Sequence, residues 1–230
     1  MDALLRRRAM IAAGGGSPTP PTPTTIPYIR GGGNGSYIDT GITSDSDTKI
    51  IVWARNFNVG TDVNWLFGTR TSTPSYFELV AGRLGNTGKI GGFFGGSATW
   101  HTDAWPYFSH YHKYELSADG LFVDDTQLIS AYSGTFSGSV NIHLFGYNAN
   151  GVNSGSLLPA DICACKIYKG GVLVRDYTPV NSPSVGLYDA VSDTVFTNAG
   201  TGSFTYGTFN ANAYTPLEYI ATSGSSDSGV

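Results

Sequence analysis

Side chains of the kind that bind sugars are concentrated in one stretch of the sequence, Trp100–His112 (WHTDAWPYFSHYH). Aromatic rings stack against the apolar faces of sugar rings, while amide and carboxylate groups hydrogen-bond to the hydroxyls. Pro106 indicates that part of the stretch is a loop or the edge of a sheet. The candidate stacking residues are therefore Trp100, Trp105 and Tyr107.

A polar loop, Asn148–Asn153 (NANGVN), supplies amides that could border such a sugar site, through Asn148 and Asn150. The alternative is that the aromatic rings belong to a core or to a subunit contact. Burial of a large ring contributes several kcal/mol to a core, so composition alone favours this alternative. Both interpretations stay open at the level of the sequence.

Two short pairs have the residue types of metal ligands. His110 and His112 would project from one side of a strand, and neutral imidazoles suit a transition metal. Asp45 and Asp47 lie in a polar segment and could offer oxygens to calcium. Each pair is also typical of an ordinary strand or turn. We therefore predict no metal site and no cofactor, and keep the four residues as weak candidates only.

The composition is that of a turn-rich β protein. Charged residues make up 13% of the 230 residues, against roughly 25% in an average domain, and glycine occurs 31 times. A long-helix protein would contain more Glu, Lys, Leu and Ala. The net charge of −4 leaves no basic face for nucleic acid, and no apolar run approaches the ~20 residues of a membrane span. We expect neither nucleic acid nor a membrane as a partner.

Short segments separated by Gly, Asn, Asp and Ser turns predict strands throughout residues 26–209. Two hairpins are the clearest, Lys113–Asp124 around an Asp-Gly turn, and Ile162–Tyr168 with Val172–Tyr177. The other predicted strands are Lys49–Phe57, Trp65–Arg70, Tyr76–Val80, Val140–Tyr147, Val185–Tyr188 and Thr194–Thr197. No stretch keeps a 3.6-residue apolar period over three turns. The sequence therefore predicts an all-β sandwich or barrel, with less than about a tenth of the residues in helix.

Cys163 and Cys165 lie two residues apart in one of these strands. Residues i and i+2 of a strand point the same way, which is a poor geometry for a mutual disulfide. We expect two small, buried or half-buried thiols and no disulfide.

The N-terminal residues have the composition of an anchor joined to a domain by a spacer. Residues 1–13 contain apolar and basic side chains but are too short to fold alone. A cleaved signal peptide would need an apolar stretch of roughly 7–15 residues, and Ala9–Ala13 is shorter. Residues 14–25 (GGGSPTPPTPTT) predict a flexible and then extended linker. The anchor side chains are Leu4, Leu5, Arg6, Arg7, Arg8, Met10 and Ile11, and the alternative is a tail without a partner.

The C-terminal residues are similar to the beginning of the domain. Residues 215–230 (TPLEYIATSGSSDSGV) align with residues 24–42 (TTIPYIRGGGNGSYIDTGI) with a single gap. Residues 210–230 are therefore expected to be a linker and the start of a possible second repeat, or a strand added to a neighbour. Chance similarity of two turn-flanked strands is the alternative.

Five motifs carry a resemblance to a known family. They are YIDTGI at 37–42, WLFGTR at 65–70, HLFGYN at 143–148, DICACKIYKGGVLVRDYTPV at 161–180 and GLYDAVSDTVFTNAGTGSF at 186–204. Together they resemble the concanavalin A-like (LamG-type) lectin/glucanase domain, in the variant found in phage and gut-bacterial surface proteins. The opening LLRRRAMIAAGGG is similar to the N-termini of virion proteins of tailed, crAss-like phages of gut Bacteroidales. The resemblance covers about residues 26–207 and implies an antiparallel two-sheet jelly-roll sandwich with an extended N-terminal anchor peptide.

Glycosidases of this family place Glu-x-Asp-x-x-Glu along one strand, so that a retaining pair of carboxylates lies about 5–5.5 Å apart. This chain has three glutamates, Glu78, Glu115 and Glu218, and none has that spacing. Asp124 and Asp125 are adjacent and should point to opposite faces of a strand. No G-x-S-x-G segment is present either. We predict that the protein is not an enzyme, and a glycoside hydrolase is the less favoured alternative.

The resemblance implies a phage virion structural protein, either a head-fibre or capsid-decoration protein or a tail-fibre component. Residues 1–13 would dock on other virion proteins, of the capsid or of the portal and tail, and the lectin-like module would be displayed outside. Phage fibres as a class lead us to expect a homo-oligomer such as a trimer. The alternative function is a carbohydrate-binding surface module that recognises host or mucosal glycans.

Overall fold

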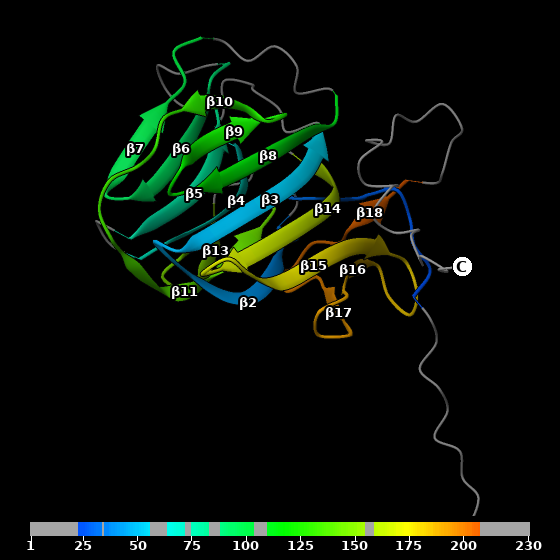
Figure 1. The fold of residues 1–230 in the computed structure, drawn as a ribbon. Coiled ribbons are helices and arrows are strands. Elements are labelled where there is room, and N and C mark those ends of the chain that lie inside the picture. Colours follow the sequence, from blue (N-terminus) through cyan, green and yellow to red (C-terminus); the bar gives the residue numbers. More distant parts are fainter. Residues whose placement is uncertain are drawn as a thin grey trace, which may run out of the picture.

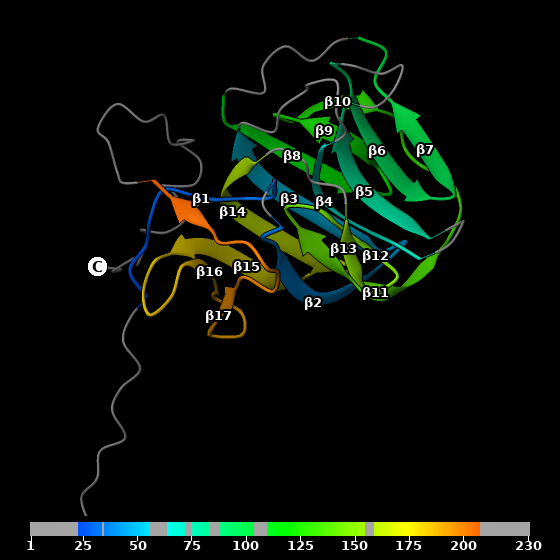
Figure 2. The ribbon, with the colours of Figure 1, turned by 180° about the vertical axis from the view of Figure 1, so that it is seen from behind.

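The computed structural model describes residues 23–33, 35–55, 64–71, 75–82, 88–103, 110–154 and 159–207. They form two β-sheets that pack face to face (Figure 1), and Figure 2 shows the second sheet from behind. Within these residues there is no helix, and hence none that is long and apolar enough to cross a membrane. The all-β prediction is confirmed. The predicted anchor at 1–13, most of the linker and residues 210–230 lie outside the described residues.

The first sheet is built around two long strands, β3 (Thr48–Arg55) and β14 (Ala160–Lys169), which pair antiparallel. Two short strands, β1 (Ile29–Gly31) and β18 (Thr205–Tyr206), extend the sheet beside the first residues of β14. In spatial order, the other described strands are β10 (Thr126–Ile129), β9 (Gly120–Val123) and β8 (His112–Ser117) on the β3 side, and β15 (Val172–Val180), β16 (Gly186–Asp189) and β17 (Thr194–Thr197) on the β14 side.

The second sheet has the spatial order β13 (Val152–Ser154), β12 (Tyr147–Ala149), β4 (Asn64–Arg70), β5 (Tyr76–Ala81), β6 (Ile90–Gly95) and β7 (Ser97–Trp100). β11 (Ser137–Leu144) also pairs with β4 and connects it to β2 (Ile38–Asp45). Neighbouring strands in the described part are antiparallel, except that β12 runs parallel to β4. The two sheets therefore form the expected antiparallel sandwich.

Alternate residues of both sheets fill one core between them. In the first sheet β3 contributes Ile50 and Val52, and in the second sheet β5 contributes Phe77 and Leu79. Because successive side chains of a strand point to opposite faces, the residues between them face outward. This alternation places Glu78 on the outer face of the second sheet.

The two cysteines lie on different faces of β14. Cys165 packs in the main core, whereas Cys163 packs in a small outer cluster with Ile51 and Trp53. A register shift between Ile162 and Ala164 interrupts the regular alternation of side chains between the two faces of β14. The prediction that both thiols point the same way is therefore wrong. Both thiols are free and buried, as predicted. Burial raises the pKa of Cys163 to about 12, so this thiol stays protonated at neutral pH.

Most predicted strands are present, and the exceptions have local causes. The predicted strand Val140–Tyr147 ends at Leu144, because Phe145 has a φ of 67° and starts a turn into β12. The sequence of β6, IGGFFG, does not predict a strand, since three of its six residues are glycine and leave no side-chain alternation.

The chain enters and leaves the sandwich at the same end, because β1 and β18 pair with each other. The β1 strand is held to β14 by the buried carboxylate of Asp161. Arg30 donates to it from Nε and Nη2 at 2.5 and 2.9 Å, and Arg55 donates from Nε at 3.0 Å. Residues 23–28 and Gly207 therefore adjoin one edge of the molecule (Figure 1).

The β8–β9 hairpin turn requires glycine at position 120. Gly120 has a φ of 125°, and an added Cβ would lie 2.1 Å from the carbonyl oxygen of Ile129. We expect Gly120→Ala to lower the free energy of unfolding by about 3 kcal/mol or more, through both backbone strain and collision. The control is Gly134→Ala, where φ is 93° but nothing lies within 4 Å, so strain alone should cost about 1–2 kcal/mol. Urea unfolding of both variants measures the difference, and equal losses would contradict this account.

Candidate functional site

The outer face of the second sheet carries aromatic side chains from several strands. The pairing register aligns Trp65 of β4 with Val80 of β5, Gly91 of β6 and Trp100 of β7 in one row. Tyr76 and Glu78 lie on the same face as Val80, because they alternate with core residues along β5. This face thus carries half-buried tryptophan and tyrosine rings around one buried carboxylate.

Glu78 is a buried charge at the centre of this face. Its side chain has no exposed area, while that of Arg70 is 29% exposed. The guanidinium donates through Nε to Oε1 and through Nη2 to Oε2, each at 2.7 Å, and the indole Nε1 of Trp65 donates to Oε2 at 2.8 Å. Burial acts to lower the pKa of Arg70, but the hydrogen bond and charge of Glu78 outweigh it and the pKa is raised. The Arg70 guanidinium therefore keeps its charge at neutral pH.

Aromatic rings enclose the Arg70 guanidinium. Its central carbon lies 4.9 Å from the ring centre of Tyr76 and 5.0 Å from that of Tyr147. The Tyr147 ring also contacts Trp65, with ring centres 4.7 Å apart. Cation–π contacts of this kind fix the rings as well as the cation. We call Trp65, Arg70, Tyr76, Glu78 and Tyr147 the Arg70 patch; apart from Glu78 its members are half-buried.

Gly68 explains how the carboxylate of Glu78 fits under the patch. It lies directly opposite Glu78 in the β4–β5 pair. A Cβ at this position would approach Glu78 Cγ to 2.7 Å and the carbonyl oxygen of Phe77 to 3.0 Å. The absence of a side chain on β4 therefore provides the space that Glu78 occupies.

The Arg70 patch suits binding more than acid–base chemistry. Its charges cancel within the ion pair, its rings are held in place, and its exposed edge offers guanidinium donors. Glu78 is fully enclosed, so its carboxyl group cannot contact a substrate. Rigid aromatic rings with a few hydrogen-bond donors are the components of a surface that stacks on an uncharged ligand.

Trp100, the first predicted stacking residue, lies on the outer face but packs against its own sheet. Its ring covers Gly91, where an added Cβ would lie 2.9 Å from Cε3, and it meets Phe93 edge-on at 5.7 Å between centres. The other two candidates, Trp105 and Tyr107, lie outside the described residues.

Asn148 and Asn150 lie in the β12–β13 hairpin, and three strands separate them from Trp100. The Asn148 amide donates to the carbonyl of Asn141 at 3.0 Å and accepts from the Gly151 N–H at 2.7 Å. The backbone N–H of Asn150 donates to the carbonyl of Arg70 at 3.1 Å. The structure thus brings this loop beside the Arg70 patch, as a support, and does not bring it to Trp100.

Two of the weak metal candidates, Asp45 and His112, are engaged by other side chains. Asp45 pairs with Lys169, and the backbone N–H of Asp47 donates to its Oδ1 at 3.0 Å. Burial acts to raise the pKa of Asp45, but its hydrogen bonds and the charge of Lys169 lower it overall. His112 Nδ1 lies 2.5 Å from Asp124 Oδ2, and His110 precedes the strand. Among the described residues, no three His, Cys, Asp or Glu side chains are grouped as a metal site.

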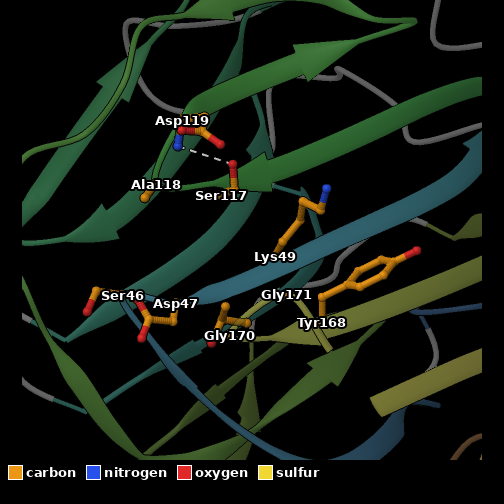
Figure 3. A pocket seen from close by; sticks show the side chains of 10 residues that line it. Ser46, Asp47, Lys49, Ser117, Ala118, Asp119, Tyr168, Gly170 and Gly171 are labelled. Atoms are coloured by element: carbon orange, nitrogen blue, oxygen red, sulfur yellow. Dashed lines mark hydrogen bonds between the residues drawn. The ribbon is translucent and has the colours of Figure 1, made fainter. Parts of the chain in front are cut away.

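A pocket of about 310 Å³ lies at one end of the first sheet, where the turns that join β2 to β3, β8 to β9 and β14 to β15 meet (Figure 3). We call it the turn pocket. The figure shows Ser117 and Asp119 on one side and Asp47, Lys49 and Tyr168 on the other. The full lining is Ser46, Asp47, Thr48, Lys49, Ser117, Ala118, Asp119, Tyr168, Gly170 and Gly171.

No known protein family and no curated protein matches this chain. Its function is therefore inferred from the sequence motifs, the Arg70 patch and the turn pocket themselves.

Sequence reasoning missed the Arg70 patch because a register shift creates it. Trp65 and Arg70 are five residues apart and would point to opposite faces of a regular strand. The shift between Trp65 and Phe67 in the β4–β5 pair places both on the outer face. The one available signal was Glu78, a charged residue between Phe77 and Leu79 in a strand of apolar alternation.

Proposed function

We propose that this chain is a structural protein of a virion, a head-fibre, capsid-decoration or tail-fibre component that displays a lectin-like module. The sandwich is of the concanavalin A-like jelly-roll type in this proposal. Residues 1–13 bind other virion proteins, of the capsid or of the portal and tail, and several copies assemble as a homo-oligomer such as a trimer. The five motifs and the anchor-and-spacer composition of the N-terminus support it.

The observation that carries this proposal is the placement of the chain ends relative to the turn pocket. β14 runs from the Arg30–Asp161 contact, beside β1 and β18, to Lys169 next to the pocket. At ~3.3 Å per residue, Asp161 and Lys169 are separated by about 26 Å. A module joined to a particle through the β1 end would therefore present the turn end outward.

Quantitative mass spectrometry of purified virus particles tests the virion assignment. The proposal predicts that peptides of this chain co-purify with the capsid proteins at a fixed copy number per particle. Recovery of the chain only in the soluble fraction of infected cells would contradict it.

The second candidate function is carbohydrate binding, and the Arg70 patch is the observation that favours it. The patch combines half-buried rings of Trp65, Tyr76 and Tyr147 with a guanidinium whose charge Glu78 balances. Such a face suits stacking on uncharged glycans, as a displayed lectin would need. Both functions can hold for the same protein.

A glycan array with the full chain tests this second function. We expect retention of uncharged glycans, and Trp65→Ala should weaken it by about tenfold or more, because a stacking ring is lost. The matched control is Tyr206→Ala. It removes an exposed ring from β18, which belongs to the first sheet, whereas the Arg70 patch lies on the second. Circular dichroism verifies that both variants are folded, and equal retention by Trp65→Ala and the unmodified chain would contradict the assignment.

A further inference from the structure

The turn pocket is separate from the Arg70 patch and lies on the other sheet. Three turns form it: the β2–β3 turn between the two sheets with Asp47, the β8–β9 hairpin turn with Asp119, and the β14–β15 hairpin turn with Gly170. Its volume of about 310 Å³ is at the lower end of the range for small-ligand sites, which fits a single ring-sized group.

Hydrogen bonds hold these turns in place. The N–H of Gly170 donates to the carbonyl of Asp47 at 3.1 Å, which ties two of the turns together. In the third turn the N–H of Asp119 donates to Ser117 Oγ at 3.2 Å, and the Gln127 amide donates to the carbonyl of Asp119 at 2.8 Å. The backbone of the pocket is thus fixed before a ligand arrives, which lowers the entropy lost on binding.

The lining combines acceptors, a donor and an aromatic ring. Asp47 and Asp119 are exposed, and within the described residues their carboxylates have no hydrogen-bond or ion-pair partner. Lys49 Nζ lies 5.1 Å from the ring centre of Tyr168 and 3.6 Å from Glu115 Oε1, so the ammonium is held at the pocket wall. Hydroxyl groups of a ligand could donate to the two carboxylates and accept from Lys49.

We propose that the turn pocket binds one uncharged pyranose unit of a glycan. The lining has two carboxylates, Asp47 and Asp119, and one ammonium, that of Lys49, which also pairs with Glu115. This excess of negative charge disfavours an anionic sugar. Vicinal hydroxyls suit the carboxylates of Asp47 and Asp119, and the Tyr168 ring offers an apolar edge. The inference rests on the proposed carbohydrate recognition for its class of ligand, but it is independent of the Arg70 patch.

Titration of the full chain with methyl glycosides tests this proposal. The probes are the methyl glycosides of glucose, galactose, mannose and N-acetylglucosamine, with methyl glucuronoside and ethylamine as the charged comparisons. We expect saturable binding of at least one neutral glycoside by calorimetry or NMR, and about tenfold weaker binding by Asp119→Asn, which loses a charge-assisted hydrogen bond. Asp125→Asn, in the next turn and paired with Lys113, should bind as the unmodified chain does.

Three results would overturn the proposal: no saturation by any neutral glycoside, equal binding by Asp119→Asn and the unmodified chain, or tighter binding of either charged comparison. Failure here is distinguishable from failure of the Arg70 patch. Trp65→Ala should leave the monosaccharide titration unchanged while it weakens retention on the array. Loss of the titration in Trp65→Ala would place the monosaccharide in the patch and also contradict the pocket.

Discussion

Replacement of Arg70 by methionine should lower the free energy of unfolding by about 3–5 kcal/mol, because it leaves the enclosed Glu78 carboxylate without its cation. Both hydrogen bonds from the guanidinium at 2.7 Å are lost, and the neutral indole of Trp65 does not balance the charge. Urea unfolding at neutral pH measures the loss. A change below about 1 kcal/mol would mean that Glu78 is not held as the structure describes.

A matched variant separates this effect from the loss of any buried arginine. Arg55→Met removes one of two guanidinium groups from Asp161 and leaves Arg30 in place, so we expect a smaller loss than for Arg70→Met. The double variant Arg70→Met/Glu78→Leu removes both charges and should recover a large part of the stability of the single variant. Equal losses in Arg55→Met and Arg70→Met, or no recovery in the double variant, would contradict this explanation.

Deletion of residues 1–13 should leave the sandwich folded and the protein absent from virus particles. Leu4, Leu5, Met10 and Ile11 are the apolar side chains for docking, and three arginines add charge, but the segment is too short to fold without a partner. Ordering a flexible segment opposes binding, and several copies on one fibre offset this through effective concentration. Quantification of the variant in purified particles measures incorporation.

The control for this deletion keeps the anchor and changes the spacer. Replacement of residues 17–22 by glycine and serine at equal length should preserve incorporation, because this proposal requires only length from these residues. Normal copy number of the deletion variant would show that attachment runs through the globular domain.

The strands could be predicted because their signals are local. Alternation in Tyr76–Val80 and the Asp119-Gly120 turn specify a strand and a hairpin without reference to distant residues. The glycine-rich β6 has no such alternation, and its strand depends on pairing with β5 and β7. The fold class can be predicted from local alternation and turn residues. The order of the strands depends on which strands pair, and local signals do not show this.

The candidate sites depend on features that spacing does not reveal. The Arg70 patch needs the register shift in β4 and the empty position at Gly68, and both become apparent only when β5 is in place. The turn pocket combines Asp47, Asp119 and Tyr168 from turns that are distant in sequence. In contrast, Trp100 has the composition of a binding residue but covers Gly91 of its own sheet.

The orientation of the sandwich on the particle tests the central claim most directly. A cryo-electron microscopy reconstruction of purified particles, with this chain located by comparison to particles of the 1–13 deletion, would show which end faces the virion. We predict that the paired strands β1 and β18 face the particle and that the turn pocket points to solvent. A sandwich with its turn end against the particle, or no density that depends on this chain, would contradict the account.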